Sequence, residues 1–502
     1  MLSLVIVSVG VPIVAAIACL AGRDRASKPI AVIASIITAI AAVMLSVRLP
    51  HETRLFGSMP WLGQGGLKGL WGYQLDPLAC IMLLASTVIG VGIAVYSAGY
   101  LSDENLEHAV KAGQARYYFW LMLFIGSMAG IALSPTLLQL LVFWETTTLC
   151  SWVLIPFYDN KESVKAGIKA LVMTSFGGLF FIGGLVWVFS VTGSCAFSAL
   201  GLMTPQTRAA AFALFMIAAW AKSAQVPFHT WLPDAMAAPT PISAYLHAAS
   251  MVKAGVFVLA RLLSAGWLLP TGMGLTLSIG ALVTIFAALY MYFHQDDLKR
   301  LLAYSTIAQL GFMFLGLGLA ALGSKMAFRG AMLHVLMHSC AKSLMFLTAG
   351  AIAYATGTRS ISRLSGLARR MPITAVCFFV GVFALTGVPP LACFWSKFYI
   401  LTGALEIRGW FGPFVLIFIV IESLITFGWF LWIGQKIFFG KPRVNELAAA
   451  PGHGETAAEL EPHAVGRLAP PPTMDWVLIA LTIVCVIAPI AGIPLVQAIA
   501  LR

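Results

Sequence analysis

The chain has 502 residues, of which 60% are hydrophobic and 10% are charged, and its mean hydropathy is +0.92. Soluble domains carry about 25% charged residues, so this composition excludes a cytosolic protein with a solvated surface. Apolar runs of about 18 residues or more recur along the chain, and each is long enough to cross a bilayer core of about 30 Å. The sequence therefore predicts an all-α, polytopic membrane protein.

Hydropathy predicts about fourteen membrane-spanning helices. The expected spans are residues 2–21, 29–48, 77–100, 116–134, 136–157, 166–191, 208–224, 240–263, 274–293, 299–322, 327–355, 372–403, 412–439 and 474–500. No basic segment precedes the first apolar run, so we interpret it as a retained helix and not as a cleaved signal. Two long polar intervals interrupt the pattern: residues 49–76 are rich in Gly and Trp, and residues 440–473 resemble an extramembrane linker.

The basic residues of the loops predict the orientation. Sixteen Lys and Arg residues follow odd-numbered spans, whereas eight, including Arg261, follow even-numbered spans. Because Lys and Arg accumulate on the cytoplasmic side, we expect a bacterial inner-membrane protein with both termini outside. The net charge of +12 is then loop charge, and it does not indicate nucleic-acid binding.

Five expected spans contain ionisable side chains that lipid disfavours. A charge at the bilayer centre costs at least ~2.5–3.5 kcal/mol, so each such residue is a candidate functional group. In chain order these residues are Glu145, Lys222, His247, Lys253, His334, His338, Lys342 and Lys397. Pro227 follows the first of the lysines and Pro389-Pro390 precedes the last, so we expect the seventh and twelfth helices to be broken there.

The eleventh span carries the most regular pattern. His334, His338 and Lys342 are spaced four apart, which places them on one face of a helix over about 12 Å. Such a stripe suits a proton relay, because histidine titrates near neutral pH and a desolvated lysine can do the same. The alternatives are a polar seam between packed helices, and a metal or haem site on the two histidines, for which no third ligand is obvious.

Glu145 and Lys222 form the natural pair of opposite charges. Their interaction is either a static bridge that fixes helix packing or a switchable one, in which an approaching charge makes the lysine release its proton. Glu422 is the candidate acidic partner for Lys397, while Lys253 has few acidic candidates.

Other polar residues have weaker patterns. Tyr304 and Lys169 are candidate accessory groups, the first as a hydroxyl near the relay and the second as a residue that reaches the interface or caps a proton entry path. The charged residues between 296 and 300, including Lys299, are expected only to solvate a helix end. The eight cysteines contain no C-x-x-C pair, which disfavours iron–sulfur, zinc and redox-disulfide sites.

The two broken spans lie five helices apart, a spacing that indicates a repeat. Because five is odd, the second unit starts on the opposite face of the membrane, so the two units are inverted relative to each other. We therefore expect five-helix repeats at residues 116–263 and 264–439. The remaining parts are residues 1–115 with the first three helices, the linker 440–473, and residues 474–502 with the last helix.

Five segments resemble one known family. They are FWETTTLCSWVLI, AKSAQVPFHTWLPDAMAAPTPISAYLHAASMVKAG, DLKRLLAYSTIAQLG, HVLMHSCAKSLMFLTAGAI and TGVPPLACFWSKF. The chain resembles the antiporter-like subunits of respiratory complex I, Mrp-type sodium/proton antiporters and membrane-bound hydrogenases, and within them component D of hydrogenase-4. Ser339 and Cys340 depart from the family pattern, which changes the packing near the relay.

The resemblance implies two inverted five-helix bundles and a role for each buried charge. Glu145 with Lys222 matches the family's regulating pair, Lys253 its central connector and Lys397 its terminal proton site. The stripe at 334, 338 and 342 matches its eleventh-helix relay.

These observations favour a proton-translocating, non-catalytic subunit of a redox-driven complex, either hydrogenase-4-like or complex I-like. The alternative is a subunit of a sodium/proton antiporter, since both need the same lysines. An enzyme with redox chemistry of its own is disfavoured, because no phosphate-binding Gly loop or cofactor motif is present. We expect no cofactor on this chain, iron–sulfur clusters and possible nickel–iron on partner subunits, and protons or sodium as the transported ion.

Overall fold

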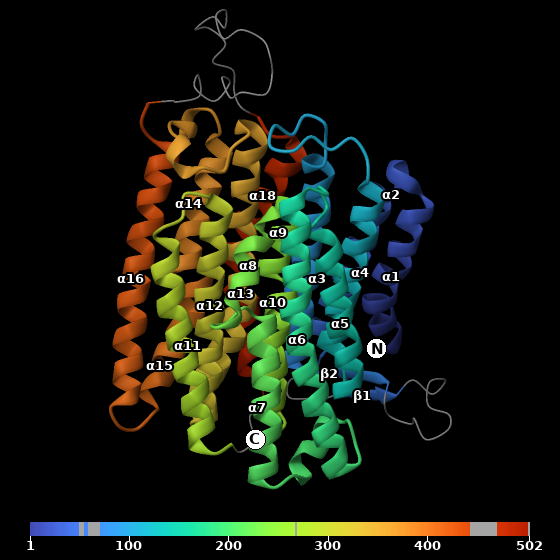
Figure 1. Cartoon of the computed structure of the whole chain (residues 1–502), viewed down its shortest axis with the longest axis vertical. Coiled ribbons are helices and arrows are strands. Elements are labelled where there is room, and N and C mark those ends of the chain that lie inside the picture. The colour runs from blue at the N-terminus through green and yellow to red at the C-terminus, as the bar shows by residue number, and fades with distance from the viewer. Residues whose placement is uncertain (50–54, 59–70, 267–268, 442–468, 500–502) are drawn as a thin grey trace, which may run out of the picture.

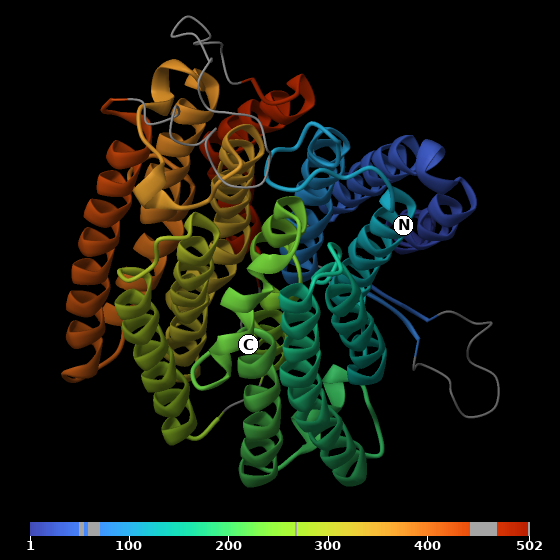
Figure 2. The same ribbon diagram turned by 45° about the horizontal axis from the view of Figure 1, so that its top comes forward.

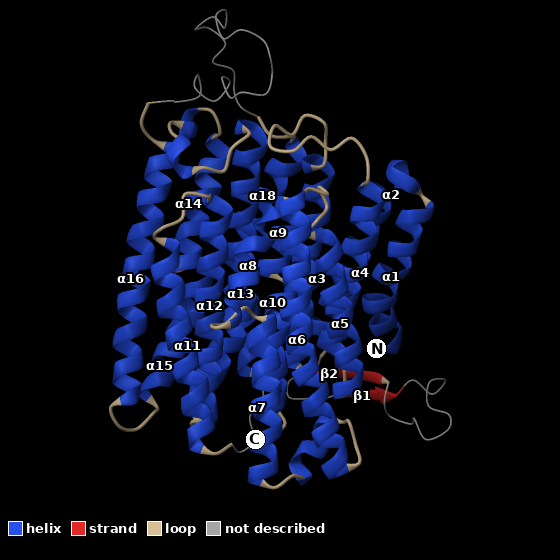
Figure 3. Cartoon of the chain, in the orientation of Figure 1, coloured by secondary structure: helices blue, strands red, loops and turns tan. Residues whose placement is uncertain are grey.

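The computed structural model describes residues 1–49, 55–58, 71–266, 269–441 and 469–499. Helices account for most of these residues (Figure 3), and β1 (Leu55–Ser58) pairs with β2 (Gly72–Leu75) in a small antiparallel ribbon. Most of the expected linker at 440–473 and much of the interval at 49–76 lie outside the described residues. Within the described ranges the fold is all-α apart from this ribbon.

Twelve spans in the described residues are long and apolar enough to cross a membrane. They are α1 (Leu2–Ala21), α2 (Arg23–Arg48), α3 (Pro77–Tyr100), α4 (Gln114–Leu133), α5 (Leu137–Leu154), α6 (Lys161–Thr192), α9 (Thr240–Ala248) continued by α10 (Met251–Ser264), α11 (Thr271–Tyr292), α12 (Leu298–Ala321), α13 (Lys325–Thr356), α16 (Phe411–Phe438) and α18 (Pro472–Gln497). The chain is a multi-pass membrane protein.

The seventh and twelfth expected spans are the two that fall outside this set. The seventh is α7 (Pro205–Lys222) followed by short turns and α8 (Trp231–Asp234), and the twelfth is divided into α14 (Pro372–Thr386) and α15 (Ala392–Leu405). The eighth span is broken as well, between α9 and α10, which the sequence analysis did not predict. Helix breaks free backbone carbonyl groups, and these need partners inside a membrane protein.

The helices form an elongated bundle around α13. Figures 1 and 2 show α1 and α2 at one edge and α16 at the opposite edge. The apolar window of α13 is wholly buried, whereas in α1, α6 and α16 no more than a third of the window is buried, as expected for helices that contact lipid. Glycines allow α13 and α15 to approach closely, because a Cβ at Gly403 would overlap the backbone of Ala327.

The two ends of the bundle are identified by the loops that they hold. The loops after α1, α3 and α13 meet at the upper end in Figure 1, whereas the N-terminus lies towards the lower end. Arg329 near the start of α13 donates to the carbonyl of Gln497, so the end of α18 is also at the lower end. We call the upper end, which holds Arg23, Lys111 and Arg359, the basic end.

Candidate functional site

Four of the expected lysines, at positions 222, 253, 342 and 397, are buried inside the bundle. Among the described residues, three of them have hydrogen-bond partners that are all neutral oxygen atoms, and only the fourth lies within 4.0 Å of a carboxylate. A buried ammonium without a carboxylate partner is weakly stabilised, which favours loss of its proton. The three lysines without a carboxylate partner therefore have the chemistry of proton-exchanging groups.

Lys222 is the last residue of α7, and its ammonium group contacts α5. Its Nζ donates to the carbonyl of Trp144 at 2.8 Å and to Oγ1 of Thr148 at 2.6 Å, and it lies 4.8 Å from the Trp144 ring centroid. The indole of Trp231 donates to the freed carbonyl of Ala221, which caps the end of α7 at 3.1 Å. The helix break thus fixes the lysine at the α5–α7 interface.

Glu145 lies half-buried on α5, next to the residues that bind Lys222. The described residues contain no ion pair within 4.0 Å between the two side chains, although the carboxylate is within electrostatic range of the ammonium. Gly178 of α6 makes room for this carboxylate, because a Cβ there would overlap Oε1 of Glu145. The two side chains are therefore adjacent but form no direct ion pair in this structure.

Lys253 connects α10 to α13. Its Nζ donates to the carbonyl of Val335 at 2.7 Å and to the hydroxyl of Ser339. From the sequence, Ser339 was expected only to change the packing near the relay. In the structure its hydroxyl accepts a hydrogen bond from the lysine. A serine hydroxyl both donates and accepts, so it can pass a proton as well as hold one.

The stripe on α13 faces α12 and α15. His334 shares hydrogen bonds with Ser396 at 2.7 Å and with Gln309 at 2.9 Å, and Lys342 donates to Ser305. The ring centroid of His338 lies 5.8 Å from that of His334. These contacts connect three helices through one face of α13.

Two buried histidines have no hydrogen-bond partner among the described residues. Both ring nitrogens of His338 on α13 are unpaired, and so are both of His247 on α9, whose ring lies 4.8 Å from that of Phe346. Buried polar atoms in proteins are almost always satisfied by protein or by ordered water. The two imidazoles are therefore expected to bind water.

Lys397 on α15 lies at the far end of the stripe, beside the break in the twelfth span. Its Nζ donates to the freed carbonyl of Thr386 at 3.3 Å and to Ser423 at 3.0 Å, and it lies 3.9 Å from Oε2 of Glu422 on α16. Thr426 donates to Oε1 of the same carboxylate at 2.8 Å. A cleft of about 330 Å³ opens between the break and α16 with Lys397 in its wall.

The structure brings most, but not all, of these groups together. Lys253, His334 and Lys397 converge on α13, since Ser396, the partner of His334, is the neighbour of Lys397 along α15. Lys222 and Glu145 form a separate group across the α7–α10 interface, where Gly255 packs against Ala219. No direct hydrogen bond joins the two groups within the described ranges.

The accessory residues have other surroundings. Lys169 forms an ion pair with Asp234 at 2.7 Å, and Tyr304 is partly exposed with no hydrogen bond to another described residue. The expectation that Lys299 is solvated is wrong. This side chain is 1% exposed and donates to the carbonyl of Ala238 at 2.6 Å, because loops from distant parts of the sequence cover it.

Metal ligation has no support from the described residues, in which no group of three or more His, Cys, Asp or Glu side chains could hold an ion. All eight cysteines are free and buried. The histidine pair on α13 instead has serine and glutamine partners on one ring and unpaired nitrogens on the other.

Two known protein families match the sequence. The family described as "NADH:quinone oxidoreductase/Mrp antiporter, TM" matches residues 134–426, and that described as "NADH-Ubiquinone oxidoreductase (complex I), chain 5 N-terminus" matches residues 61–118. The first match covers more than half of the chain and contains the buried residues from Glu145 to Glu422.

Similar curated proteins include "NAD(P)H-quinone oxidoreductase subunit 5, chloroplastic" from several plants. The protein of Anthoceros angustus is 33% identical over 449 residues, which cover 84% of this chain and 59% of the relative. That of Chaetosphaeridium globosum is 38% identical over 368 residues, which cover 69% of this chain and 52% of the relative. The chain thus spans between half and three fifths of the length of these relatives. The expected likeness to component D of hydrogenase-4 has no support among them.

Two solved structures share the fold. A chain of the Mrp complex from Dietzia sp. DQ12-45-1b superposes with a TM-score of 0.75 at 29% identity, covering 97% of this chain and 56% of that one. A chain of the membrane-bound sulfane sulfur reductase (MBS), an archaeal respiratory membrane complex, superposes with a TM-score of 0.82 at 22% identity. The match covers 99% of this chain and 96% of that one. The second likeness concerns the fold alone.

Proposed function

Because the chain belongs to the NADH:quinone oxidoreductase/Mrp antiporter transmembrane family, we propose that it moves protons across the membrane along its buried lysine and histidine side chains. The observation that carries this proposal is the set of buried lysines held mainly by hydroxyl and carbonyl oxygens. An ion-paired lysine keeps its proton, whereas a lysine bound to neutral acceptors can release and regain it.

The proposed path has three parts. Lys222 exchanges its proton under the influence of Glu145, whose charge stabilises the ammonium without a direct bond. Lys253 passes protons between α10 and α13 through Ser339, and His338 and His334 carry them along α13. Lys397 receives them and holds them against Glu422 until release. No electrons move in any of these steps, and each one breaks an N–H or O–H bond as another forms.

The helix breaks support this path. Freed carbonyl groups at Thr386 and Ala221 have polar partners, so the backbone beside Lys397 and Lys222 suits a hydrated environment. Two breaks five spans apart also fit our proposal of inverted repeats at residues 116–263 and 264–439, with the transport path near the membrane midplane.

We further propose that the chain is a non-catalytic subunit of a multi-subunit, redox-driven complex, complex I-like or hydrogenase-4-like. The names of the chloroplastic relatives favour the first of these. In such a complex the partner subunits would carry iron–sulfur clusters, and nickel–iron in the hydrogenase case. The alternative is a sodium/proton antiporter subunit, which the similarity to a chain of an Mrp complex favours. We place the basic end in the bacterial cytoplasm and both termini outside.

Proton flux into sealed membrane vesicles that contain the complete complex tests the proposal. Lys222→Ala and Lys397→Ala should each abolish the flux while the complex still assembles, and Lys161→Ala, at an exposed lysine on α6, is the matched control. Wild-type flux in both buried-lysine variants would overturn the proposal.

The parent complex is identified by two further measurements on the same preparation. Copurification of iron–sulfur or nickel–iron proteins supports the redox-driven assembly. Flux that requires sodium, in a preparation without such proteins, supports the antiporter instead.

A further inference from the structure

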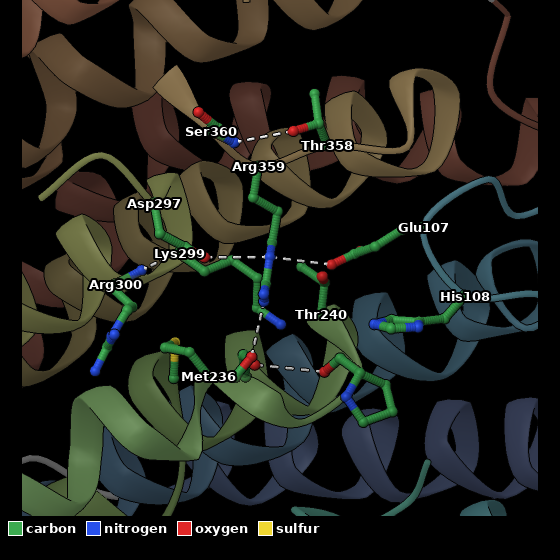
Figure 4. A network of polar contacts seen from close by, with 12 residues as sticks. Glu107, His108, Met236, Thr240, Asp297, Lys299, Arg300, Thr358, Arg359 and Ser360 are labelled. Carbon is green, nitrogen blue, oxygen red and sulfur yellow. Dashed lines mark hydrogen bonds and ion pairs between the residues drawn. The ribbon is translucent and has the colours of Figure 1, made fainter. Parts of the chain in front are cut away.

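Four charged side chains meet under the loops at the basic end (Figure 4). They are Glu107 from the loop after α3, Asp297 and Lys299 from the start of α12, and Arg359 from the loop after α13. The path described above uses none of them. Their burial is costly unless they are paired, so their convergence requires an explanation.

Arg359 joins the two carboxylates of this cluster. Its Nε lies 3.2 Å from Oε1 of Glu107 and 3.3 Å from Oδ2 of Asp297, and its NH1 donates to the carbonyl of Met236 at 3.1 Å. The backbone is fixed too, because Leu298 N donates to the Arg359 carbonyl at 3.0 Å. The guanidinium therefore holds both carboxylates at one place.

Lys299 lies beneath this cluster and is almost completely buried. Within the described part of the chain its Nζ makes one hydrogen bond, to Ala238, although an ammonium offers three donors. No described carboxylate lies within 4.0 Å of it, yet Glu107 and Asp297 are within electrostatic range. The side chain of Asp297 is 26% exposed, so water reaches one of these acids.

The cluster also connects inward to the relay. Tyr100 donates to Oε2 of Glu107 at 2.9 Å, and its hydroxyl lies 3.1 Å from that of Thr240, the first residue of α9. His247, with both ring nitrogens unpaired, lies seven residues further along α9, or about 10 Å along the axis. The charge of Lys299 reaches this imidazole, and a few water molecules in series would complete the connection.

We propose that Lys299 loads the buried chain with protons from the basic end, and that Arg359 is a positioning residue that holds the donor carboxylates beside it. This inference rests on the proposed function. A proton from water first binds a carboxylate, Glu107 or Asp297; the O–H bond then breaks as an N–H bond forms on the neutral amine of Lys299. The ammonium passes that proton through water to a ring nitrogen of His247.

The electrostatic surroundings agree with this role. The titratable and charged groups within electrostatic range of Lys299 are Glu107, Asp297, Arg359, His108 and His247. Burial lowers the pKa of His108, Glu107 opposes this shift, and Arg359 and Lys299 lower the pKa further. This imidazole therefore stays neutral near pH 7, and Asp297, whose side chain is 26% exposed, is the acid that water reaches.

Substitution of Lys299 in the complete complex tests the inference. Lys299→Gln removes the charge, whereas Lys299→Arg keeps the charge but cannot release a proton at accessible pH. Both variants should lower proton flux into sealed vesicles at least tenfold, while Arg363→Gln, at an exposed arginine on the same loop as Arg359, should match wild type. Wild-type flux in Lys299→Arg would mean that the residue is only a structural charge, which would overturn the inference.

A failure of this inference can be told apart from a failure of the proposed function. If Lys222→Ala also pumps normally, the proposed function fails; if it loses flux while both Lys299 variants pump normally, only the loading role fails. Should Lys299→Arg not assemble, Glu107→Gln combined with Asp297→Asn decides the question, because both amides keep an acceptor oxygen but cannot bind and release a proton at accessible pH. The double variant should lose flux at least tenfold, and unchanged flux would overturn the inference.

The positioning role of Arg359 is tested by the pH profile of proton flux in the variant Arg359→Lys. Arg359→Lys keeps one positive charge but cannot contact both carboxylates with a fork of N–H donors. The pH profile of flux should therefore change, because the two carboxylates are no longer held at one place beside Lys299. An unchanged pH profile would remove Arg359 from the mechanism.

Discussion

Glu422→Gln is the substitution for which the structure gives the clearest estimate of the electrostatic energy that is lost. Oε2 of Glu422 lies 3.9 Å from Nζ of Lys397, and both side chains are at most 5% exposed. At an effective dielectric constant of about 20, opposite charges at this distance attract by about 4 kcal/mol. Thr426 donates to Oε1, and a glutamine oxygen can still accept that bond, so the fold should be retained.

The variant loses this attraction of about 4 kcal/mol, and among the described residues the Lys397 ammonium then has no carboxylate within 4.0 Å. Proton flux into vesicles at neutral pH should therefore fall at least tenfold, and it should recover as the pH is lowered, because more protons are then available to reload the amine. Glu406→Gln is the matched control, since that residue lies exposed just after α15 and, within the described ranges, its carboxylate accepts a hydrogen bond from Ser324 alone. Identical flux and pH profiles in the two variants would refute the electrostatic reasoning.

Three further predictions follow from the packing. Glu145→Gln should slow or uncouple pumping, because Lys222 loses the nearby negative charge; unaltered coupling, measured as protons moved per substrate turnover, would reduce Glu145 to a structural role. Gly178→Ala should lower flux about tenfold, because the added methyl group displaces the Glu145 carboxylate, and Gly428→Ala in open space is its control. Arg261→Met leaves Asp76 buried without its ion-pair partner, so thermal unfolding of the complex should show a loss of about 3–5 kcal/mol, and an unchanged midpoint would contradict this.

Hydropathy and intramembrane charge were enough to predict much of this structure. Each of the fourteen expected spans corresponds to a helix or to a broken helix, because an apolar run of that length has few alternatives in a bilayer. Proline identified the breaks near Lys222 and Lys397, since it removes a helical hydrogen bond. The break between α9 and α10 has no proline, and its Ala-Ala-Ser-Met sequence contains no comparable signal.

The partners of the buried charges could not be predicted in the same way. The acceptor of Lys253 is the backbone carbonyl of Val335, and every residue type has such a group. Lys299 and Arg261 occupy helix ends, where a solvated charge is the usual outcome. Each is buried because segments far away in sequence cover it, which is a property of tertiary structure.

Ordered water in a high-resolution density map of the complete complex would show whether the buried lysines and histidines form one proton path. We predict water molecules that connect Lys222 to Lys253 and that bind the unpaired nitrogens of His338 and His247. Together they should form one continuous file that reaches Lys397. Apolar side chains that fill those gaps and leave the amines and imidazoles dry and separate would contradict it.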